Sequence, residues 1–213
     1  MPTASSFKLQ SKRKNLFLRL SRGHFATSHS HINYYIDVTT QKTRLSEAKA
    51  VAEELVSYYS STTIVDTILC LDGTEVIGTC LAEALTAGSY VNLNAHQTIY
   101  VATPEHTTGS QLIFRDNMIP MIAGKNVLIL AASVTTGYTA AAAIEAINYY
   151  GGKVSGVAAI FTLVDKVGDY PVRATFQLSD LPDYESHPSV DCPLCKKGVK
   201  VDALVNSYGY SKL

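Results

Sequence analysis

Five consecutive residues of this sequence have the side chains and spacing of a phosphate-binding loop: Thr135, Thr136, Gly137, Tyr138 and Thr139. They follow the apolar run Asn126–Ala132 and lead directly into Thr139–Tyr150, which has helical spacing. A loop at a helix N-terminus offers backbone N–H groups, hydroxyl groups and the positive end of the helix dipole, and together these bind a phosphate monoester. The alternative is a helix cap with a tight turn, which uses the same residue types. The sequence therefore predicts an anion site here, with a purely structural turn as the other interpretation.

A second group with possible chemistry lies near the C-terminal end, where Cys192 and Cys195 form a Cys-x-x-Cys motif that follows His187. This motif is one half of a zinc knuckle, and His187 or one of the N-terminal histidines could complete the ligand set. The sequence contains no second Cys-x-x-Cys, so a reduced tight turn is the alternative. A redox role is less favoured, because the pair does not open a helix after a strand. Zinc is thus a possible cofactor.

The N-terminal histidines are His24, His29 and His31. Residues two apart share one face of a strand, so His29 and His31 could bind a metal or a phosphate together. No metal-ligand pattern surrounds them, and ordinary hydrogen-bonded histidines are the favoured interpretation.

Composition excludes several classes of protein. Of the 213 residues 46% are hydrophobic and only 17% charged, against about 25% charged in typical domains, which excludes a disordered chain or a coiled coil. Eighteen basic residues balance eighteen acidic ones, so we expect neither a nucleic acid nor a membrane as partner. Four cysteines do not form a disulfide framework, and Cys70 and Cys80 lie in apolar runs that suit small buried residues. Without a secretory signal or an apolar run of membrane-spanning length, we expect a cytoplasmic protein.

The elements that must position these residues alternate along the chain. Apolar residues at helical spacing predict helices at 46–60, 75–87 and 139–150, and apolar runs of strand length lie at 63–71, 97–102, 126–132 and 153–165. Strands separated by such helices form βαβ units, which predicts an α/β fold with a mainly parallel twisted sheet flanked by helices.

Ligands of such sheets bind at the carboxyl ends of the strands, which directs attention to residues 71–78, 102–125 and 131–139. The stretch Thr103–Gly124 is longer than an ordinary connection, and loops of that length are usually functional lids or disordered. The last fifty residues have a looser pattern and are expected to form a small appendage on the sheet.

We call residues 135–139 the threonine loop. The segment around this loop resembles the signature of the type I phosphoribosyltransferases, in particular the orotate phosphoribosyltransferases. That signature is a hydrophobic strand, two acidic residues, two apolar or small residues, and then Thr-Thr-Gly-x-Thr/Ser; here Val127–Leu130, Ala131–Ala132 and Ser133–Val134 precede the threonine loop. Ser30–Asp37 resembles the family segment that ends in Pro-Tyr-Tyr-(Ile/Phe)-Asp and borders the orotate base. The resemblance covers about residues 20–165, and the Cys-Pro-Leu-Cys tail also resembles the ends of some orotate-type members.

This resemblance implies roles for further residues. Tyr34 and Tyr35 would border a base, with packing against the sheet as the alternative. It also implies the type I phosphoribosyltransferase fold, with a small hood from the terminal segments: one domain, 1–213, with a core at about 45–165 and a hood from 20–40 and 166–213. A homodimer is implied as well.

Three parts of the family's transferase apparatus are missing. The acidic pair that contacts the ribose hydroxyls and helps to place Mg²⁺ is replaced by Ala131 and Ala132, which can do neither. The mobile loop that carries basic residues in the family corresponds here to 102–109, with no lysine and one acid. The diphosphate loop corresponds to Asp72, Gly73, Thr74 and Glu75, where two carboxylates would face a diphosphate.

These departures predict an orotate phosphoribosyltransferase-like protein that binds a nucleotide or phosphoribosyl compound without efficient transfer, and no catalytic residue is assigned. The alternative is an active orotate phosphoribosyltransferase that makes orotidine 5′-phosphate from orotate and phosphoribosyl diphosphate in pyrimidine biosynthesis. It would need Mg²⁺, with acids and lysines supplied from elsewhere in the dimer. A third hypothesis is a scaffold that binds no small molecule.

Overall fold

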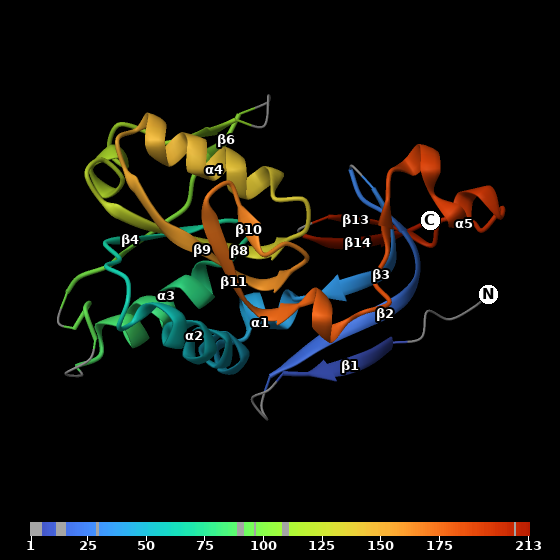
Figure 1. Cartoon of the computed structure of the whole chain (residues 1–213), viewed down its shortest axis with the longest axis horizontal. Coiled ribbons are helices and arrows are strands. Elements are labelled where there is room, and N and C mark those ends of the chain that lie inside the picture. Colours follow the sequence, from blue (N-terminus) through green and yellow to red (C-terminus); the bar gives the residue numbers. More distant parts are fainter. Residues whose placement is uncertain are drawn as a thin grey trace. The chain divides into compact units, whose positions relative to one another are not determined.

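The computed structural model describes residues 6–11, 16–28, 30–88, 92–95, 97–107, 111–206 and 208–213. The chain divides into two compact units. We call Gln41–Gln177 the core unit, and Met1–Thr40 with Leu178–Leu213 the terminal unit. Figure 1 shows the elements of both in sequence colours.

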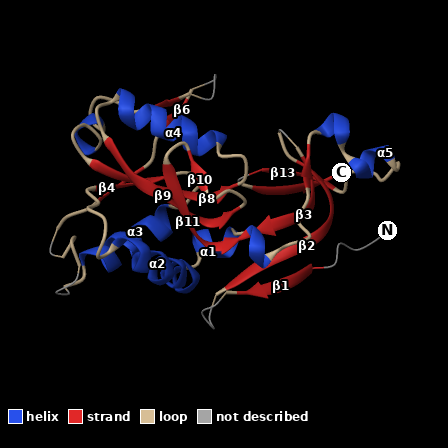
Figure 2. Cartoon of the chain, viewed as in Figure 1, coloured by secondary structure: helices blue, strands red, loops and turns tan. Residues whose placement is uncertain are grey.

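The core unit is built on one six-stranded sheet (Figure 2). In spatial order its strands are β10 (Lys166–Val167), β11 (Tyr170–Gln177), β9 (Lys153–Thr162), β8 (Asn126–Val134), β4 (Thr67–Cys70) and β5 (Tyr100–Ala102). All neighbouring pairs are parallel except β10 with β11. The predicted α/β fold with a mainly parallel sheet is confirmed.

Three long helices cover this sheet: α2 (Leu45–Tyr59), α3 (Glu75–Thr86) and α4 (Tyr138–Tyr149). In Figure 1, α4 lies over one face and α2 with α3 over the other. Strand residues alternate between these layers, so Leu69 and Ile129 belong to the apolar cluster that includes α4, whereas Ile68 lies beside Gly78 of α3. Coverage on both faces explains why β8 is apolar at nearly every position. Among the described residues, no helix is long and apolar enough to cross a membrane.

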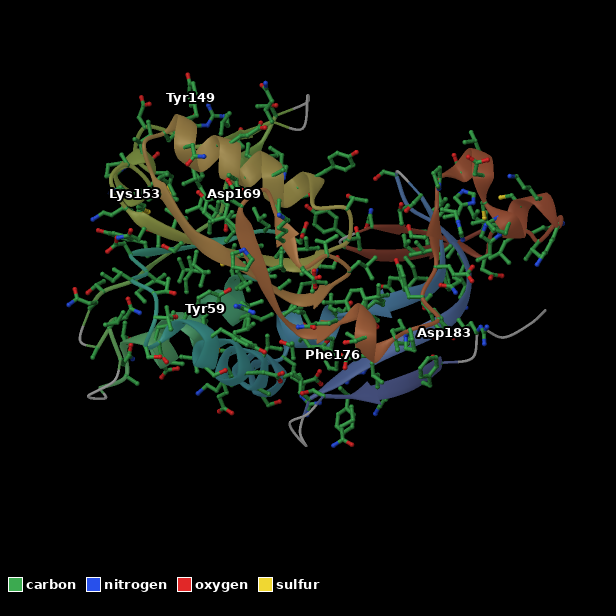
Figure 3. The ribbon with its side chains drawn as sticks, in the orientation of Figure 1. Tyr59, Tyr149, Lys153, Asp169, Phe176 and Asp183 are labelled. Atoms are coloured by element: carbon green, nitrogen blue, oxygen red, sulfur yellow. The ribbon has the colours of Figure 1, made fainter. Side chains whose placement is uncertain are left out.

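The end of α2 is anchored to the sheet by Tyr59, which is labelled in Figure 3. Its hydroxyl donates a hydrogen bond to the Val157 carbonyl of β9 at 3.1 Å. The ring lies 3.2 Å from the position that a Cβ at Gly156 would occupy, so glycine there lets the helix approach the strand. Burial of this phenol raises the pKa of Tyr59 well above its usual value.

The long loop after β5 contains short regular elements among its described residues. β6 (Glu105–His106) and β7 (Leu112–Ile113) form a two-stranded antiparallel pair, and a short 3₁₀ turn, η1, follows at Ile119–Met121. Leu112 and Phe114 are buried in the apolar cluster that includes α4, which anchors the base of this hairpin. Residues 108–110 of the predicted lid segment lie outside the described residues.

One strand of the core sheet lies in the segment that we expected to belong to the hood. β11 pairs in parallel with β9, and its Val172, Ala174 and Phe176 are buried on alternate positions. The period-two burial places 170–177 in the core sheet rather than in an appendage. The single-domain organisation over 1–213 stays a prediction.

The terminal unit combines both ends of the chain in a second sheet. Its strands run in the order β12 (Ser186–His187), β3 (His31–Asp37), β2 (Phe17–Ala26), β13 (Ala203–Asn206) and β14 (Gly209–Lys212), and β1 (Ser6–Gln10) pairs with β2. The short helix α5 (Pro193–Lys196) and the 3₁₀ turns η2 (Leu178–Asp180) and η3 (Ser189–Asp191) connect the C-terminal strands. A small apolar cluster supports the sheet: Phe25, Ile32, Tyr35, Ala203 and Val205, with Tyr184 packed against them.

Candidate phosphate-binding site

The threonine loop, residues 135–139, lies at the carboxyl end of β8, as predicted. Thr135, Thr136 and Gly137 follow the last strand residue Val134, and Tyr138 and Thr139 are the first two residues of α4. Gly137 is the residue before the helix and has a φ of +82°, in the left-handed region. A Cβ at this position would lie 3.1 Å from a methyl group of Val167. Both the backbone conformation and the space therefore favour glycine here.

The loop presents hydrogen-bond donors to solvent. Thr135, Thr136 and Thr139 are exposed, whereas Ala140 is buried and holds the start of the helix in the core. The Ala141 N–H donates to the Gly137 carbonyl at 2.8 Å. The earlier N–H groups of the first turn, such as those of Thr139 and Ala140, have no acceptor within an α-helix and point along its axis out of the helix start. With the helix dipole, this arrangement favours an anion.

Ala131 and Ala132 occupy β8 just before this loop, with exposed fractions of 2% and 3%. Ala131 lies opposite Ala159 of β9 and belongs to the apolar cluster that includes α4. Methyl groups at both positions leave no acceptor for a sugar hydroxyl and no ligand for a metal.

Residues 72–75, which we expect to correspond to the family's diphosphate loop, follow β4. Thr74 fixes it, because its hydroxyl lies 2.9 Å from the Leu71 carbonyl and 3.0 Å from that of Leu130. Asp72 has a φ of +57° and is partly buried. Burial raises the pKa of its carboxyl above the usual value, against the opposing effects of the Lys42 ammonium, the Ala132 backbone and His106. Glu75 is exposed and accepts a hydrogen bond from the Thr103 hydroxyl at 3.2 Å.

Lys42 is a residue at this site that sequence reasoning missed. Its side chain is largely buried and its Nζ donates to the Asp72 carbonyl at 2.7 Å. The ammonium therefore supports the backbone of a loop that carries carboxylates. No motif singles out this lysine, because it reaches the loop only through the packing of residues 30 positions apart.

Arg115 is the second residue that sequence reasoning missed. Its guanidinium binds the Glu105 carboxylate through two hydrogen bonds, Nε to Oε2 at 2.7 Å and Nη2 to Oε1 at 2.6 Å. The pair raises the pKa of Arg115 and lowers that of Glu105, the hydrogen bonds being the main cause. This bidentate ion pair links the first residue of β6 to the segment after β7, and the Glu105 carboxylate balances the charge of the Arg115 guanidinium.

Tyr34 and Tyr35 lie in the terminal unit on opposite faces of β3 and are 3% and 8% exposed. The Tyr34 hydroxyl donates to the Asp183 carboxylate, and its ring contacts Phe7 edge-on at 5.9 Å. Tyr35 packs against Tyr210 with ring centroids 5.2 Å apart, and burial raises its pKa to about 12. Both rings therefore make the packing contacts of the alternative interpretation, and base binding by them stays a prediction.

The predicted metal ligands also lie in the terminal unit. Cys192 and Cys195 lie in one group of donor atoms with His24 and His31. That group does not include His187, whose Nε2 is 3.3 Å from a carboxylate oxygen of Glu185. His29 lies outside the described residues.

No protein-family model matches the chain. A curated relative is the orotate phosphoribosyltransferase of Chlorobaculum parvum (strain DSM 263 / NCIMB 8327), 27% identical over 183 residues, which are 85% of this chain and 86% of that protein.

Solved structures show the same fold. The orotate phosphoribosyltransferase of Mycobacterium tuberculosis H37Rv in complex with Fe(III) dicitrate superposes with a TM-score of 0.54 at 17% identity, over 77% of this chain and 92% of that one. The same enzyme in complex with inorganic phosphate gives a TM-score of 0.51 at 18% identity, over 71% and 83%. UMP synthase of Leishmania donovani gives 0.54 at 19% identity, over 76% of this chain and 34% of the longer one. Over most of its length the chain is similar in sequence to an orotate phosphoribosyltransferase, and it has the fold of the type I phosphoribosyltransferases.

Proposed function

We propose that the chain binds a phosphorylated small molecule, a nucleotide or a phosphoribosyl compound, through residues 135–139 and transfers a phosphoribosyl group inefficiently. The observation that carries this proposal is the contrast, at the carboxyl end of β8, between residues that can bind a phosphate and residues that cannot bind a ribose or a metal. A loop of exposed threonines leads into the start of α4, two residues after a pair of buried alanines at the positions of the family's acids.

Phosphate binding needs only the features that the loop retains. Backbone N–H groups of the first turn of α4 and the hydroxyls of Thr135, Thr136 and Thr139 can surround the terminal oxygens of a phosphate monoester. Gly137 allows the backbone to approach the anion, because it carries no Cβ. The inorganic phosphate complex of the M. tuberculosis enzyme supports a phosphate ligand for this fold.

Transfer needs groups that these positions do not supply. Each lost charge-assisted hydrogen bond between an acid and the ribose hydroxyls removes about 1.5–3 kcal/mol of stabilisation. The carboxylates of Asp72 and Glu75 add repulsion toward a diphosphate, and Arg115 is paired with Glu105. A leaving diphosphate would therefore find little electrostatic stabilisation, which commonly contributes about 10²–10³-fold per donor.

Calorimetric titration of the full chain tests the binding part. We expect UMP, AMP or ribose 5-phosphate to bind, and uridine to bind much more weakly, because the phosphate contributes most of the contacts. Thr139→Val should weaken binding, and Gly137→Val should abolish it.

Gly151→Val is the matched control for Gly137→Val. Gly151 follows the other end of α4 with a φ of +79°, so valine imposes a similar backbone strain there. If Gly151→Val lowers phosphate affinity as strongly as Gly137→Val, or if uridine binds as tightly as UMP, the proposed site is wrong.

A steady-state assay with orotate, phosphoribosyl diphosphate and Mg²⁺ tests the transfer part. We expect orotate consumption far below an ordinary enzymatic rate of about 1 s⁻¹ or more. Turnover at an ordinary rate would overturn this part and favour the active orotate phosphoribosyltransferase, with Mg²⁺ as its cofactor.

If instead none of the tested compounds binds, or shifts the melting temperature at saturating concentration, the scaffold hypothesis is favoured.

A further inference from the structure

Four side chains from distant parts of the sequence converge in the terminal unit: His24, His31, Cys192 and Cys195. One donor atom of each lies within 4.8 Å of all the others. His24 is 1% exposed and Cys192 is 2% exposed, so the group faces the interior on one side. In Figure 1, α5, which carries Cys195, lies beside the blue N-terminal strands.

The distances within the group are close to those around one tetrahedral ion, and the two that involve His31 Nδ1 are slightly shorter. His24 Nε2 lies 3.0 Å from His31 Nδ1, 3.5 Å from Cys192 Sγ and 3.7 Å from Cys195 Sγ. Cys195 Sγ lies 3.2 Å from His31 Nδ1. A tetrahedral zinc ion with bonds of about 2.0–2.1 Å to nitrogen and about 2.3 Å to sulfur holds its ligand atoms roughly 3.3–3.8 Å apart.

A backbone carbonyl outside the group determines which ring nitrogen of His24 carries the proton. Its Nδ1 lies 3.0 Å from the Val199 carbonyl, which accepts only a hydrogen bond, so Nδ1 carries the proton and Nε2 carries a lone pair. A backbone carbonyl that orients the second nitrogen of an imidazole is the usual support of a metal-binding histidine.

Hydrogen bonding alone does not account for the arrangement. The single lone pair of His24 Nε2 can accept one hydrogen bond, yet three potential donors lie within 3.7 Å of it: His31 Nδ1, Cys192 Sγ and Cys195 Sγ. Without a cation, two of these three groups would make no bond to that nitrogen at close range. A cation at the centre satisfies all four donor atoms together.

The backbone around His24 is shaped to bring it into this group. The register of β2 against β3 shifts between Arg22 and Phe25, which marks a bulge at Gly23 and His24. The His24 N–H donates to a carboxylate oxygen of Asp202 at 2.8 Å, and the Asp202 N–H donates to the His24 carbonyl at 2.7 Å. The bulge, fixed by the hydrogen bonds to Asp202, changes the direction of the His24 side chain so that it lies beside the cysteines.

We propose that His24, His31, Cys192 and Cys195 bind one Zn²⁺ ion as a closed structural site. Two imidazoles and two thiolates are a common zinc ligand set, and four protein ligands leave no position for a substrate. The ion joins β2 and β3 to the segment around α5, more than 160 residues later in the chain. This site is independent of the proposed phosphate site, since none of its ligands belongs to residues 135–139.

Metal analysis and cobalt spectroscopy of the full chain test this proposal. Protein purified under reducing conditions should contain one zinc ion per chain. After removal of zinc with a chelator, Co²⁺ should give the visible d–d bands of a tetrahedral complex and a thiolate-to-cobalt charge-transfer band. Cys195→Ser and His31→Gln should each lose the metal or change these bands.

Two matched controls separate these ligands from their neighbours. His187→Gln removes the histidine that lies opposite His31 in the sheet but outside the donor group, and Cys80→Ala removes a buried cysteine of the core unit. Both variants should keep the zinc content and the cobalt spectrum of the unchanged chain.

Chelation of the unchanged chain provides a readout that does not depend on the folding of a variant. Removal of zinc should lower the melting temperature and speed proteolysis near α5, and added Zn²⁺ should reverse both effects. The proposal is overturned if the reduced chain neither contains zinc nor binds Co²⁺. Loss of metal in His187→Gln together with its retention in His31→Gln would overturn the ligand assignment.

Discussion

The carboxyl group of Asp72 is held in surroundings that disfavour its charge. Ionisation of this side chain is unfavourable, because burial outweighs the attraction of Lys42 and raises its pKa above 3.8. A raised pKa means that the contribution of this group to stability is complete below pH 3.8 and is lost as the pH rises through the raised value. The residue also has a φ of +57°, a conformation in which asparagine is at least as favourable.

Asp72→Asn is therefore expected to raise the melting temperature at neutral pH, because the amide cannot ionise. The gain should shrink as the pH falls toward 3.8, where the carboxyl of the unchanged chain is protonated too. Thermal denaturation across this pH range checks the prediction. Asp169→Asn, in an exposed turn and labelled in Figure 3, is the control and should change little. A lower melting temperature for Asp72→Asn at neutral pH would contradict this account.

At the scale of elements, the sequence was most informative where periodicity is strong. The helices at α2, α3 and α4 and the strands at β4, β8 and β9 lie where apolar spacing predicted them. β11 was not predicted, because its alternation of Val172, Ala174 and Phe176 lies inside the segment 166–213 that we expected to form the hood. For the candidate sites, the threonine loop was placed at its strand–helix junction, whereas Lys42 required knowledge of packing between segments far apart in the sequence.

Contact between α3 and β4 depends on one glycine. A Cβ at Gly78 would overlap Cys70 Sγ and would lie 3.3 Å from a methyl group of Val101. Gly78→Ala is expected to destabilise the chain by about 1–3 kcal/mol through overpacking. Intrinsic helix propensity would instead favour alanine by about 1 kcal/mol.

Cys70→Ala combined with Gly78→Ala should recover part of that loss, because it removes the sulfur atom that the new methyl group meets. Urea denaturation of both single variants and the double variant measures this coupling. Strictly additive effects would show that the helix moves away from the strand instead of pressing on Cys70.

At the scale of the whole molecule, we predict a homodimer, as the resemblance to the orotate phosphoribosyltransferases implies. Equal numbers of basic and acidic residues give the chain a formal net charge of zero at pH 7, so two copies meet without long-range repulsion. Sedimentation velocity at micromolar concentration should give a species of twice the 23.0 kDa chain mass. Salt should change its stability only weakly, because no net repulsion has to be screened. A monomer under these conditions would contradict the prediction. It would also remove the route by which a second copy could supply acids and lysines for transfer, and so strengthen the proposal of a ligand-binding protein with little turnover.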